Sequence, residues 1–226
     1  SRDAGSSSAS RQTYISGMAV CDAAQKMKHY LEEEGYYSGK PLSEISVDAA
    51  QKGVVMFEGH FDPPTTPVDL ETSQGGPYAT YAFATHMTEV EVNEVTGACR
   101  AVRVHAAHDV GRAVNARNVR GQICGGVAMG VGFALMEEFV PGKSESFDNY
   151  YMPTSMDMPD VEAIIVEDRE PTGPYGAKGV GEPALIPQAA SIANAIKDAT
   201  GIMIHELPCH IERLKLALEA DKNNHK

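Results

Sequence analysis

Residues 78–110 read YATYAFATHMTEVEVNEVTGACRAVRVHAAHDV, and this stretch decides the class of fold. Its two ends, 78–92 and 98–110, alternate between apolar and polar residues and are rich in residues that favour strands. Between them, NEVTG (93–97) has the asparagine and the glycine of a tight turn. The stretch therefore predicts a long antiparallel β-hairpin.

Around the hairpin the hydrophobic pattern alternates between helical and strand-like spacing. Helices are predicted over 17–34, 43–52, 121–139, 183–200 and 209–220. Strands are predicted over 53–59, 161–168 and 202–207, and irregular loops over 61–77 and 140–160. This mixture indicates the α+β class, with mixed sheets and flanking helices. The order of elements also allows two similar βα-type units to lie side by side.

Composition narrows the classes of partner. The chain has 226 residues, 42% of them hydrophobic and 22% charged, as is ordinary for a globular protein. A net charge of -12 argues against nucleic acid and against an anionic membrane surface, because both require basic patches. No apolar stretch is long enough for a membrane span or a signal peptide, so we expect a cytoplasmic protein.

The four cysteines, Cys21, Cys99, Cys124 and Cys209, lie far apart and lack the close spacing of iron–sulfur or structural zinc ligands. We therefore expect free thiols. The histidines of the hairpin at 86, 105 and 108 are interpreted as structural rather than metal-binding residues.

The predicted helix at 121–139 contains five glycines, each of which lowers helix stability by up to about 1 kcal/mol relative to alanine. Such a helix is tolerated where another backbone or a bulky ligand lies close against it. The pattern thus predicts close packing on this helix.

A second glycine-rich stretch, GAKGVGEPALIP (176–187), ends in a lone carboxylate, Glu182. One interpretation is that Glu182 occupies the first turn of the helix from Pro183, where a negative charge suits the helix dipole. The other is that tight backbone and an apolar helix partly remove the carboxylate from water, which makes it a usable general base. The stretch lacks the spacing of a nucleoside-triphosphate loop.

These residues resemble a known family. GAKGVGEPALIPQAASIANAIKDATG (176–201), DVGRAVNARNVRGQICGGVAMGVGFALMEE (109–138), EVEVNEVTGACRAVRVHAAHD (89–109) and SSSASRQTYISGMAV (6–20) are similar, in that order, to the C-terminal part of the molybdenum-binding subunit of xanthine dehydrogenases and aldehyde oxidases, the molybdenum hydroxylases. The four blocks span almost the whole chain. The resemblance implies one domain over 1–226, a lobe of a molybdenum-cofactor-binding domain, with a cofactor-binding loop at 1–16, the hairpin at 78–110 and a catalytic turn and helix at 176–201.

The resemblance also assigns roles to residues. Glu182 matches the family's catalytic base, which accepts a proton while water supplies the oxygen. Gln122 matches a glutamine that hydrogen-bonds a ligand of the molybdenum. Two segments match residues along the pterin cofactor: Ala9, Ser10, Arg11, Gln12 and Thr13 at its phosphate end, and Lys178, Gly179, Val180 and Gly181 beside the metal. The resemblance implies no protein ligand to molybdenum, which the pterin dithiolene holds, and leaves open the mononucleotide or the cytosine dinucleotide form.

Two departures from the family pattern stand out. Met129 occupies a position where many members have glutamine. The half of the family's subunit that carries much of the substrate pocket has no counterpart here, so we expect a subunit of the split type, like those of nicotinate dehydrogenase, or a fragment.

The expected function is the oxidative hydroxylation of an N-heteroaromatic or aldehyde substrate, in a complex with a larger molybdopterin subunit and with subunits that carry [2Fe–2S] clusters and FAD. The alternative is a non-catalytic cofactor-binding or assembly module, or a fragment active only with its partner. A serine hydrolase is disfavoured, because the chain has no nucleophile-elbow motif.

Overall fold

The computed structural model describes residues 6–54 and 56–224. Its helices are α1 (Arg11–Glu33), α2 (Leu42–Gln51), α3 (Ala116–Leu135), α4 (Gln188–Thr200) and α5 (Ile211–Asn224), with short 3-10 helices η1 (Tyr36–Ser38) and η2 (Pro174–Gly176). Its strands are β1 (Ala84–Val92), β2 (Cys99–Asp109) and β3 (Asp160–Val166). Helices and a mixed sheet together confirm the α+β class.

The chain divides into two compact units. The first comprises Ser1–Tyr81 and Arg169–Gly179, and the second comprises Ala82–Asp168 and Val180–Lys226. The first unit thus holds α1, α2 and the loop around η2, while the second holds the sheet with α3, α4 and α5.

The second unit contains a three-stranded sheet in the order β1-β2-β3. β1 and β2 pair antiparallel, with Thr88 opposite Val104, which confirms the predicted hairpin. The turn between them is held by Asn93, whose side-chain oxygen accepts hydrogen bonds from two amides further along the turn. β3 joins β2 in parallel, and α3 makes the connection between these two strands that a parallel pair requires.

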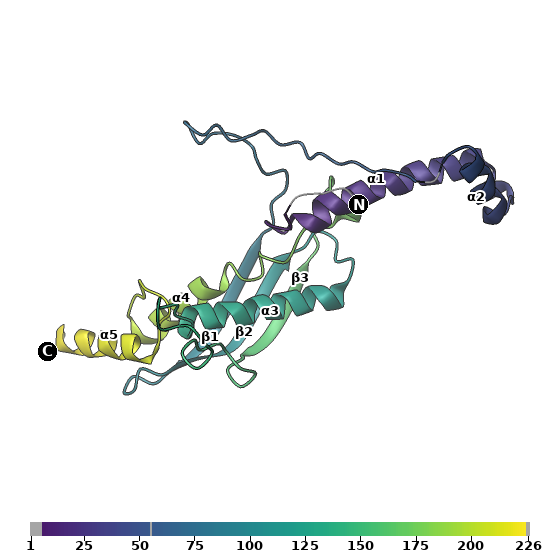
Figure 1. The fold of residues 1–226 in the computed structure, drawn as a ribbon. Coiled ribbons are helices and arrows are strands. Elements are labelled where there is room, and N and C mark those ends of the chain that lie inside the picture. The colour runs from purple at the N-terminus through teal and green to yellow at the C-terminus, as the bar shows by residue number, and fades with distance from the viewer. Residues whose placement is uncertain (1–5, 55, 225–226) are drawn as a thin grey trace. The chain divides into compact units, whose positions relative to one another are not determined.

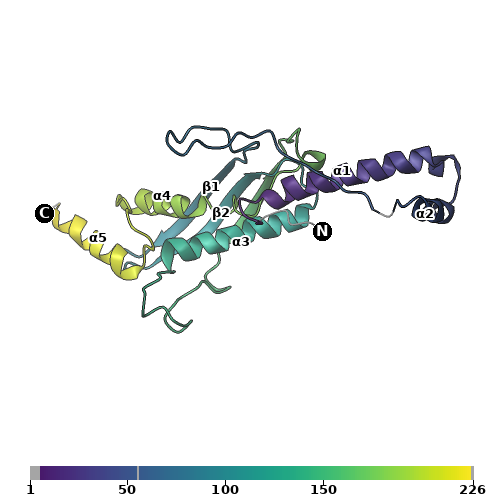
Figure 2. The ribbon, with the colours of Figure 1, turned by 45° about the horizontal axis from the view of Figure 1, so that its top comes forward.

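Two helices cover one face of this sheet (Figures 1 and 2). α3 packs on β2 and β3, α4 packs on β1, and the two helices also contact each other. Alternate strand residues point into the resulting core, where Val104 and Ala106 of β2 meet Ile123 and Val127 of α3 and Ile192 of α4. Each of these side chains is at most 1% exposed, so the core lies between sheet and helices.

The hairpin turn lies against α5. A Cβ atom on Gly97 would lie 2.7 Å from the Lys215 side chain and would overlap the carbonyl oxygen of Ile211. Gly97 also has a φ of 79°, which favours glycine. Because Leu214 and Leu218 are buried, α5 closes this end of the second unit.

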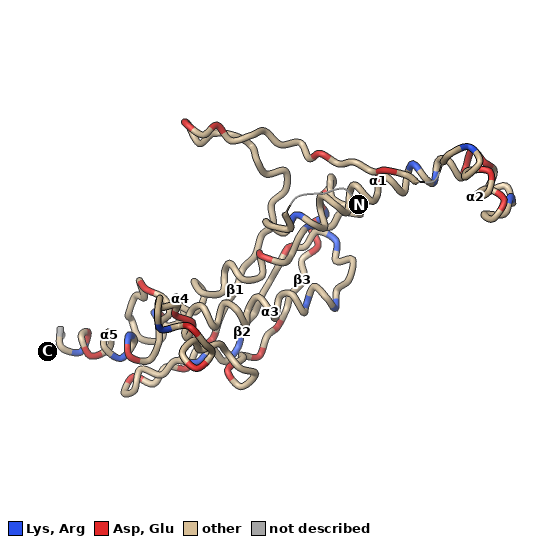
Figure 3. Tube along the Cα trace, viewed as in Figure 1, with Lys and Arg blue, Asp and Glu red and all other residues tan. Residues whose placement is uncertain are grey.

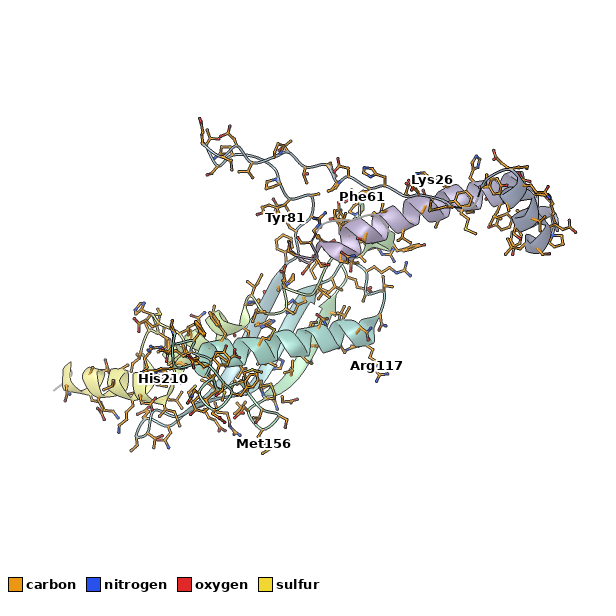
Figure 4. The ribbon with its side chains drawn as sticks, in the orientation of Figure 1. Lys26, Phe61, Tyr81, Arg117, Met156 and His210 are labelled. Carbon is orange, nitrogen blue, oxygen red and sulfur yellow. The ribbon has the colours of Figure 1, made fainter. Side chains whose placement is uncertain are left out.

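The first unit is built around α1. Pro174 of η2 packs on Gly17, where a Cβ atom would lie 2.9 Å from the proline ring. The ring of Phe61 meets that of Tyr14 edge to face at 5.4 Å between centroids, beside the helix (Figure 4). Helix α2 follows, as predicted, and ends at a turn through Gly53.

Two predicted strands are absent from the described part of the chain, each for a tertiary reason. The described residues of 53–59 form no strand: they run along α1, with Gly59 against Ala19 and Lys26 donating to the Glu58 carbonyl. Residues 202–207 also form no strand, and the apolar signal there reflects Ile202 and Ile204 packing on the core.

Further errors concern the ends of elements. The strand predicted from 78 begins at Ala84, and the helix predicted over 121–139 covers Ala116–Leu135. α1 begins six residues earlier than predicted, at Arg11, with Tyr14 buried in its first turns. α4 begins at Gln188 rather than at Pro183, and 181–187 form turns. Pro187 lacks the N–H that would close a helical turn onto the carbonyl of Pro183 and restrains the residue before it, so the helix cannot start earlier.

Among the residues that the structure describes, no helix has the length and apolar character of a membrane span. Basic and acidic residues are interspersed along the trace of both units (Figure 3).

Candidate functional site

The segment predicted to hold the cofactor's phosphate end forms the start of α1. Ala9 and Ser10 have φ values of 56° and 52°, a left-handed conformation that side chains other than glycine rarely adopt. Arg11, Gln12 and Thr13 then form the first helical turn, which no side chain caps and which has no acidic residue. Backbone amides at a helix start attract anions, so this local structure suits a phosphate group.

The structure brings a second predicted segment to this point. Gly179 lies against Ser10 so closely that a Cβ atom on it would be 2.8 Å from the Ser10 Cβ and would overlap the Ser10 carbonyl oxygen. Lys178, next to Gly179, is only 8% exposed. Two predicted cofactor-binding segments that are far apart in the sequence therefore meet in the first unit.

Glu170, which no sequence motif marks, organises the loop that carries Lys178. Its carboxylate accepts hydrogen bonds from Thr80 at 2.7 Å and from the hydroxyl and amide of Thr172 at 2.7 and 3.0 Å. The Tyr14 hydroxyl of α1 lies 2.6 Å from the same Thr172 hydroxyl. Burial alone raises the pKa of Glu170, but these hydrogen bonds and the charge of Lys178 hold it below its usual value.

In the second unit, Gln122 lies near the start of α3 and is exposed. Its neighbours Gly121 and Gly125 have nothing within 4 Å of a Cβ position. Gly126, one turn further along, lies against Ala184, where a Cβ atom would lie 2.5 Å from the carbonyl carbon. Residues four apart share a helix face, so the segment after Glu182 packs on the face of α3 that carries Gln122.

The glycine-rich helix is thus explained in two parts. Gly126 and Gly130 permit the predicted close packing, because Ala184 and Gln188 occupy the space that their side chains would need. Gly121 and Gly125 contact no such neighbour among the described residues, which leaves room for another molecule to approach this part of α3.

Glu182 lies in the turns before α4, where its carbonyl accepts a hydrogen bond from the Leu185 amide. It does not occupy the first turn of α4, so the helix-dipole interpretation is wrong. The partial removal from water expected from the sequence is also not seen, since Glu182 is exposed in the described structure. Val180 is half-buried and Gly181 exposed in the same segment.

The histidines of the hairpin have hydrogen-bond partners. His86 bonds to Gln188 and His108, and His105 bonds to Glu162, which agrees with their structural interpretation. The described residues contain no group of three or more histidine, cysteine or acidic side chains placed to hold a metal ion. The four cysteines are free thiols; burial raises the pKa of Cys99 to about 12.

Three exposed arginines also lack a sequence signal: Arg112, Arg117 and Arg120, before and within the first turns of α3 (Figure 4 labels Arg117). Their spacing is irregular, so no motif marks them.

A pocket of about 880 Å³ lies beyond the other end of α3 and is lined by residues that include Glu138, Tyr151 and His210. None of the predicted site residues lines this pocket.

The residues present fit a phosphate-bearing cofactor. The first turn of α1 offers backbone amides and contains no acidic residue, and Gly179 allows a second backbone segment to lie beside it. On α3, Gln122 offers an amide next to glycines whose space no described residue fills. Within the first unit, backbone amide donors and the buried Lys178 suit the phosphate end of such a ligand.

Comparison with known proteins identifies the group. The family model for the molybdopterin cofactor-binding domain matches residues 2–159. The chain belongs to this family of molybdenum hydroxylase domains. The resemblance stated from the sequence is thereby confirmed, and so is molybdopterin as the kind of cofactor that the family binds.

Individual relatives agree. This molybdopterin-binding chain is 33% identical over 222 residues to the aldehyde oxidoreductase of Megalodesulfovibrio gigas, covering 96% of the chain and 24% of the relative. It is 37% identical over 176 residues to a probable xanthine dehydrogenase subunit of Bacillus subtilis, covering 76% and 23%. Its fold matches the crystal structure of the aldehyde oxidoreductase of Desulfovibrio desulfuricans with a TM-score of 0.87 and 30% identity, over 96% of this chain and 24% of that one.

The molybdopterin-binding chain therefore spans about a quarter of the length of the relatives it matches. Those relatives are named as aldehyde oxidoreductases and a probable xanthine dehydrogenase subunit, which makes oxidoreduction the chemistry of the family.

Proposed function

We propose that this chain contributes a cofactor-binding segment and the catalytic base to a molybdenum hydroxylase. The observation that carries the proposal is the contact between Gly179 and Ser10, which joins two segments that the family resemblance assigns to cofactor binding. When bound, the molybdenum cofactor would supply the redox chemistry that oxidises the substrate with water as the source of oxygen.

Each group of residues has a distinct role in the proposal. Ala9, Ser10, Arg11, Gln12 and Thr13 bind the phosphate end of the pterin through backbone amides and hydroxyls. Their left-handed backbone at Ala9 and Ser10 costs about 1 kcal/mol or more per residue, and such strain is typical of sites where ligand binding compensates for it. Lys178, Gly179, Val180 and Gly181 lie along the cofactor.

Glu182 accepts the proton that is released as water provides the oxygen. The carboxylate lies on a turn between Gly181 and Pro183. Two residues after Glu182, Ala184 packs against α3 and fixes this turn. Gln122, on the same face of α3, would donate a hydrogen bond from its side-chain amide to a ligand of the molybdenum. Since Glu182 is exposed here, the proposal requires that cofactor, substrate or partner removes it from water.

The substrate is proposed to be an N-heteroaromatic compound or an aldehyde. Partner polypeptides that hold [2Fe–2S] and FAD groups would supply the electron-transfer chemistry. Whether the cofactor is the mononucleotide or the cytosine dinucleotide form is decided by extraction from the purified complex.

A larger molybdopterin-binding polypeptide is the proposed partner. The first unit supports this, because its buried hydrophobic side chains among the described residues are few: Tyr14, Ile45, Ala49 and Ala177. Apolar side chains at Val20 and Met27 of α1 and at Leu70 of the loop remain 67%, 43% and 94% exposed. Apolar exposure of this extent in a unit with a small core is typical of a surface that another polypeptide covers.

Glu182→Gln tests the proposed chemistry. It should leave the molybdenum content of the purified complex within error of wild type, because the change keeps size and shape, while turnover falls at least about a hundredfold, the usual scale for loss of a general base. Glu94→Gln, an exposed carboxylate in the hairpin turn, is the matched control.

Mass measurement of the native complex, together with metal analysis, tests the proposed partner and cofactor. Molybdenum and a larger polypeptide in stoichiometric amount support the enzyme. A stable metal-free chain, or a loaded Glu182→Gln complex that turns over at the wild-type rate, refutes the catalytic assignment and favours a binding module.

A further inference from the structure

A buried polar network lies where α4 begins, next to the turn that carries Glu182. Gln188, the first residue of α4, is fully buried. Its side-chain oxygen lies 2.7 Å from Nδ1 of His86, and its side-chain nitrogen donates to the Thr88 hydroxyl at 3.1 Å. The Ser191 hydroxyl also donates to Thr88, at 2.8 Å. The Ser191 hydroxyl also lies 3.2 Å from the backbone carbonyl oxygen of His86, so the start of α4 is tied to β1 at several points.

With the Gln188 amide oriented as in the structure, one arrangement of protons satisfies the network. Because the Gln188 nitrogen donates to Thr88, its oxygen faces His86 and accepts from Nδ1–H of that ring. Nε2 of His86 then has no proton and accepts from Nε2–H of His108 at 2.6 Å. Nδ1 of His108, which is buried and has no partner among the described residues, ends the series. Every bond up to His108 is directed, so the loss of one partner leaves a buried polar atom unsatisfied.

Helix α3 holds the same segment from the other side. A Cβ atom on Gly130 would lie 2.5 Å from Cγ of Gln188, and one on Gly126 would lie 2.5 Å from the Ala184 carbonyl carbon. Gly126 and Gly130 are four residues apart, as are Ala184 and Gln188, so two points of the segment rest on successive turns of α3. Residues 184–188 are thus clamped between α3 and β1.

We propose that Gln188 and His86 are positioning residues, which fix the turn that carries Glu182 by anchoring its C-terminal end between β1 and α3. Backbone bonds from the Leu185 amide to the Glu182 carbonyl and from the Gln188 amide to the Leu185 carbonyl link the turn to the start of α4. The clamp on Gln188 between β1 and α3 therefore bears directly on the geometry of the turn. The inference rests on the proposed function in so far as Glu182 is the base.

Hydrogen exchange of the full chain, followed by mass spectrometry, tests the anchor without any activity measurement. Gln188→Met keeps the length of the side chain but removes both hydrogen bonds. We expect exchange in the peptide covering 180–187 to accelerate by about tenfold, the effect of losing roughly 1.4 kcal/mol of local stability, while α3 and β2 stay protected. Asn194→Met, on an exposed position of α4, should leave the peptide unchanged.

A pair of variants at His86 keeps the test valid should Gln188→Met fail to fold. His86→Asn retains an N–H donor at the position of Nδ1 and should leave the exchange of 180–187 at the wild-type rate, whereas His86→Leu removes the donor and should accelerate that exchange. Unchanged exchange in both Gln188→Met and His86→Leu overturns the proposal. So does an equal acceleration throughout the second unit, because the residues then stabilise the whole unit rather than the turn.

The loaded complex separates this inference from the proposed function. In the loaded complex, Gln188→Met should lower kcat without changing KM or the molybdenum content, because the turn that carries Glu182 is less well fixed. Wild-type kcat despite accelerated exchange overturns the positioning role. Wild-type turnover in Glu182→Gln instead refutes the function of the turn, while the exchange result still decides whether Gln188 anchors it.

Discussion

Gly126→Ala is the most direct test of how α3 supports the catalytic turn. The added Cβ atom would lie 2.5 Å from the carbonyl carbon of Ala184 and 2.6 Å from its Cβ and oxygen, closer than real contacts allow. Because the obstacle includes backbone, the turn must move, at a cost of about 1–3 kcal/mol for overpacking. Alanine also stabilises the helix by about 1 kcal/mol, which offsets part of that cost.

Gly125→Ala provides the matched control one residue away. A Cβ atom there meets nothing within 4 Å in the described structure, so the change should stabilise the chain by up to about 1 kcal/mol. Urea denaturation of both variants should therefore separate them by about 1–3 kcal/mol, with Gly126→Ala the less stable. Equal denaturation midpoints would refute the close approach of Ala184 to α3, and with it the clamp on residues 184–188.

Two further predictions concern pH and loading. In the unfolded chain His108 has a pKa of 6.5, but burial, and then the charge of His86, lower it in the folded protein to about 4. The free energy of unfolding should therefore be greatest above about pH 6.5 and fall by about 3 kcal/mol between there and pH 4, because only the unfolded chain takes up the proton. Denaturation at a series of pH values should show this slope reduced in His108→Gln and retained in His105→Gln; an equal slope in both contradicts it. Gly179→Ala, whose new Cβ overlaps the Ser10 carbonyl, should lower the molybdenum content of the purified complex several-fold at an unchanged circular dichroism spectrum; full loading contradicts the role of that contact.

The hairpin and the central helices could be predicted because their signals are local. Alternation along β1 and β2 and the asparagine and glycine of their turn act within a few residues, so the structure agrees with the pattern there. The strand predictions at 53–59 and 202–207 are wrong for the converse reason. A short apolar run indicates that a segment is buried, but it does not show whether a neighbouring strand is present to pair with it. Ile202 and Ile204 are packed against the core without pairing.

The candidate site was predictable only as separate segments. The resemblance nominated Ser10, Gly179, Gln122 and Glu182, but not which of them meet. No sequence pattern marked Glu170, because an acidic residue in a polar loop is usually an ordinary surface residue. Its role depends on Thr80, Thr172 and Lys178, which only the folded structure places beside it.

The sequence by itself determined the α+β class, the hairpin and the family, because strand alternation, turn residues and glycine-rich motifs are written in consecutive residues. Only the tertiary structure decided that Ser10 meets Gly179, that Ala184 rests on Gly126 and that Gln188 joins His86. These contacts link residues between 58 and 169 positions apart. They form, and stabilise the protein, only after packing of the core has brought these distant segments together.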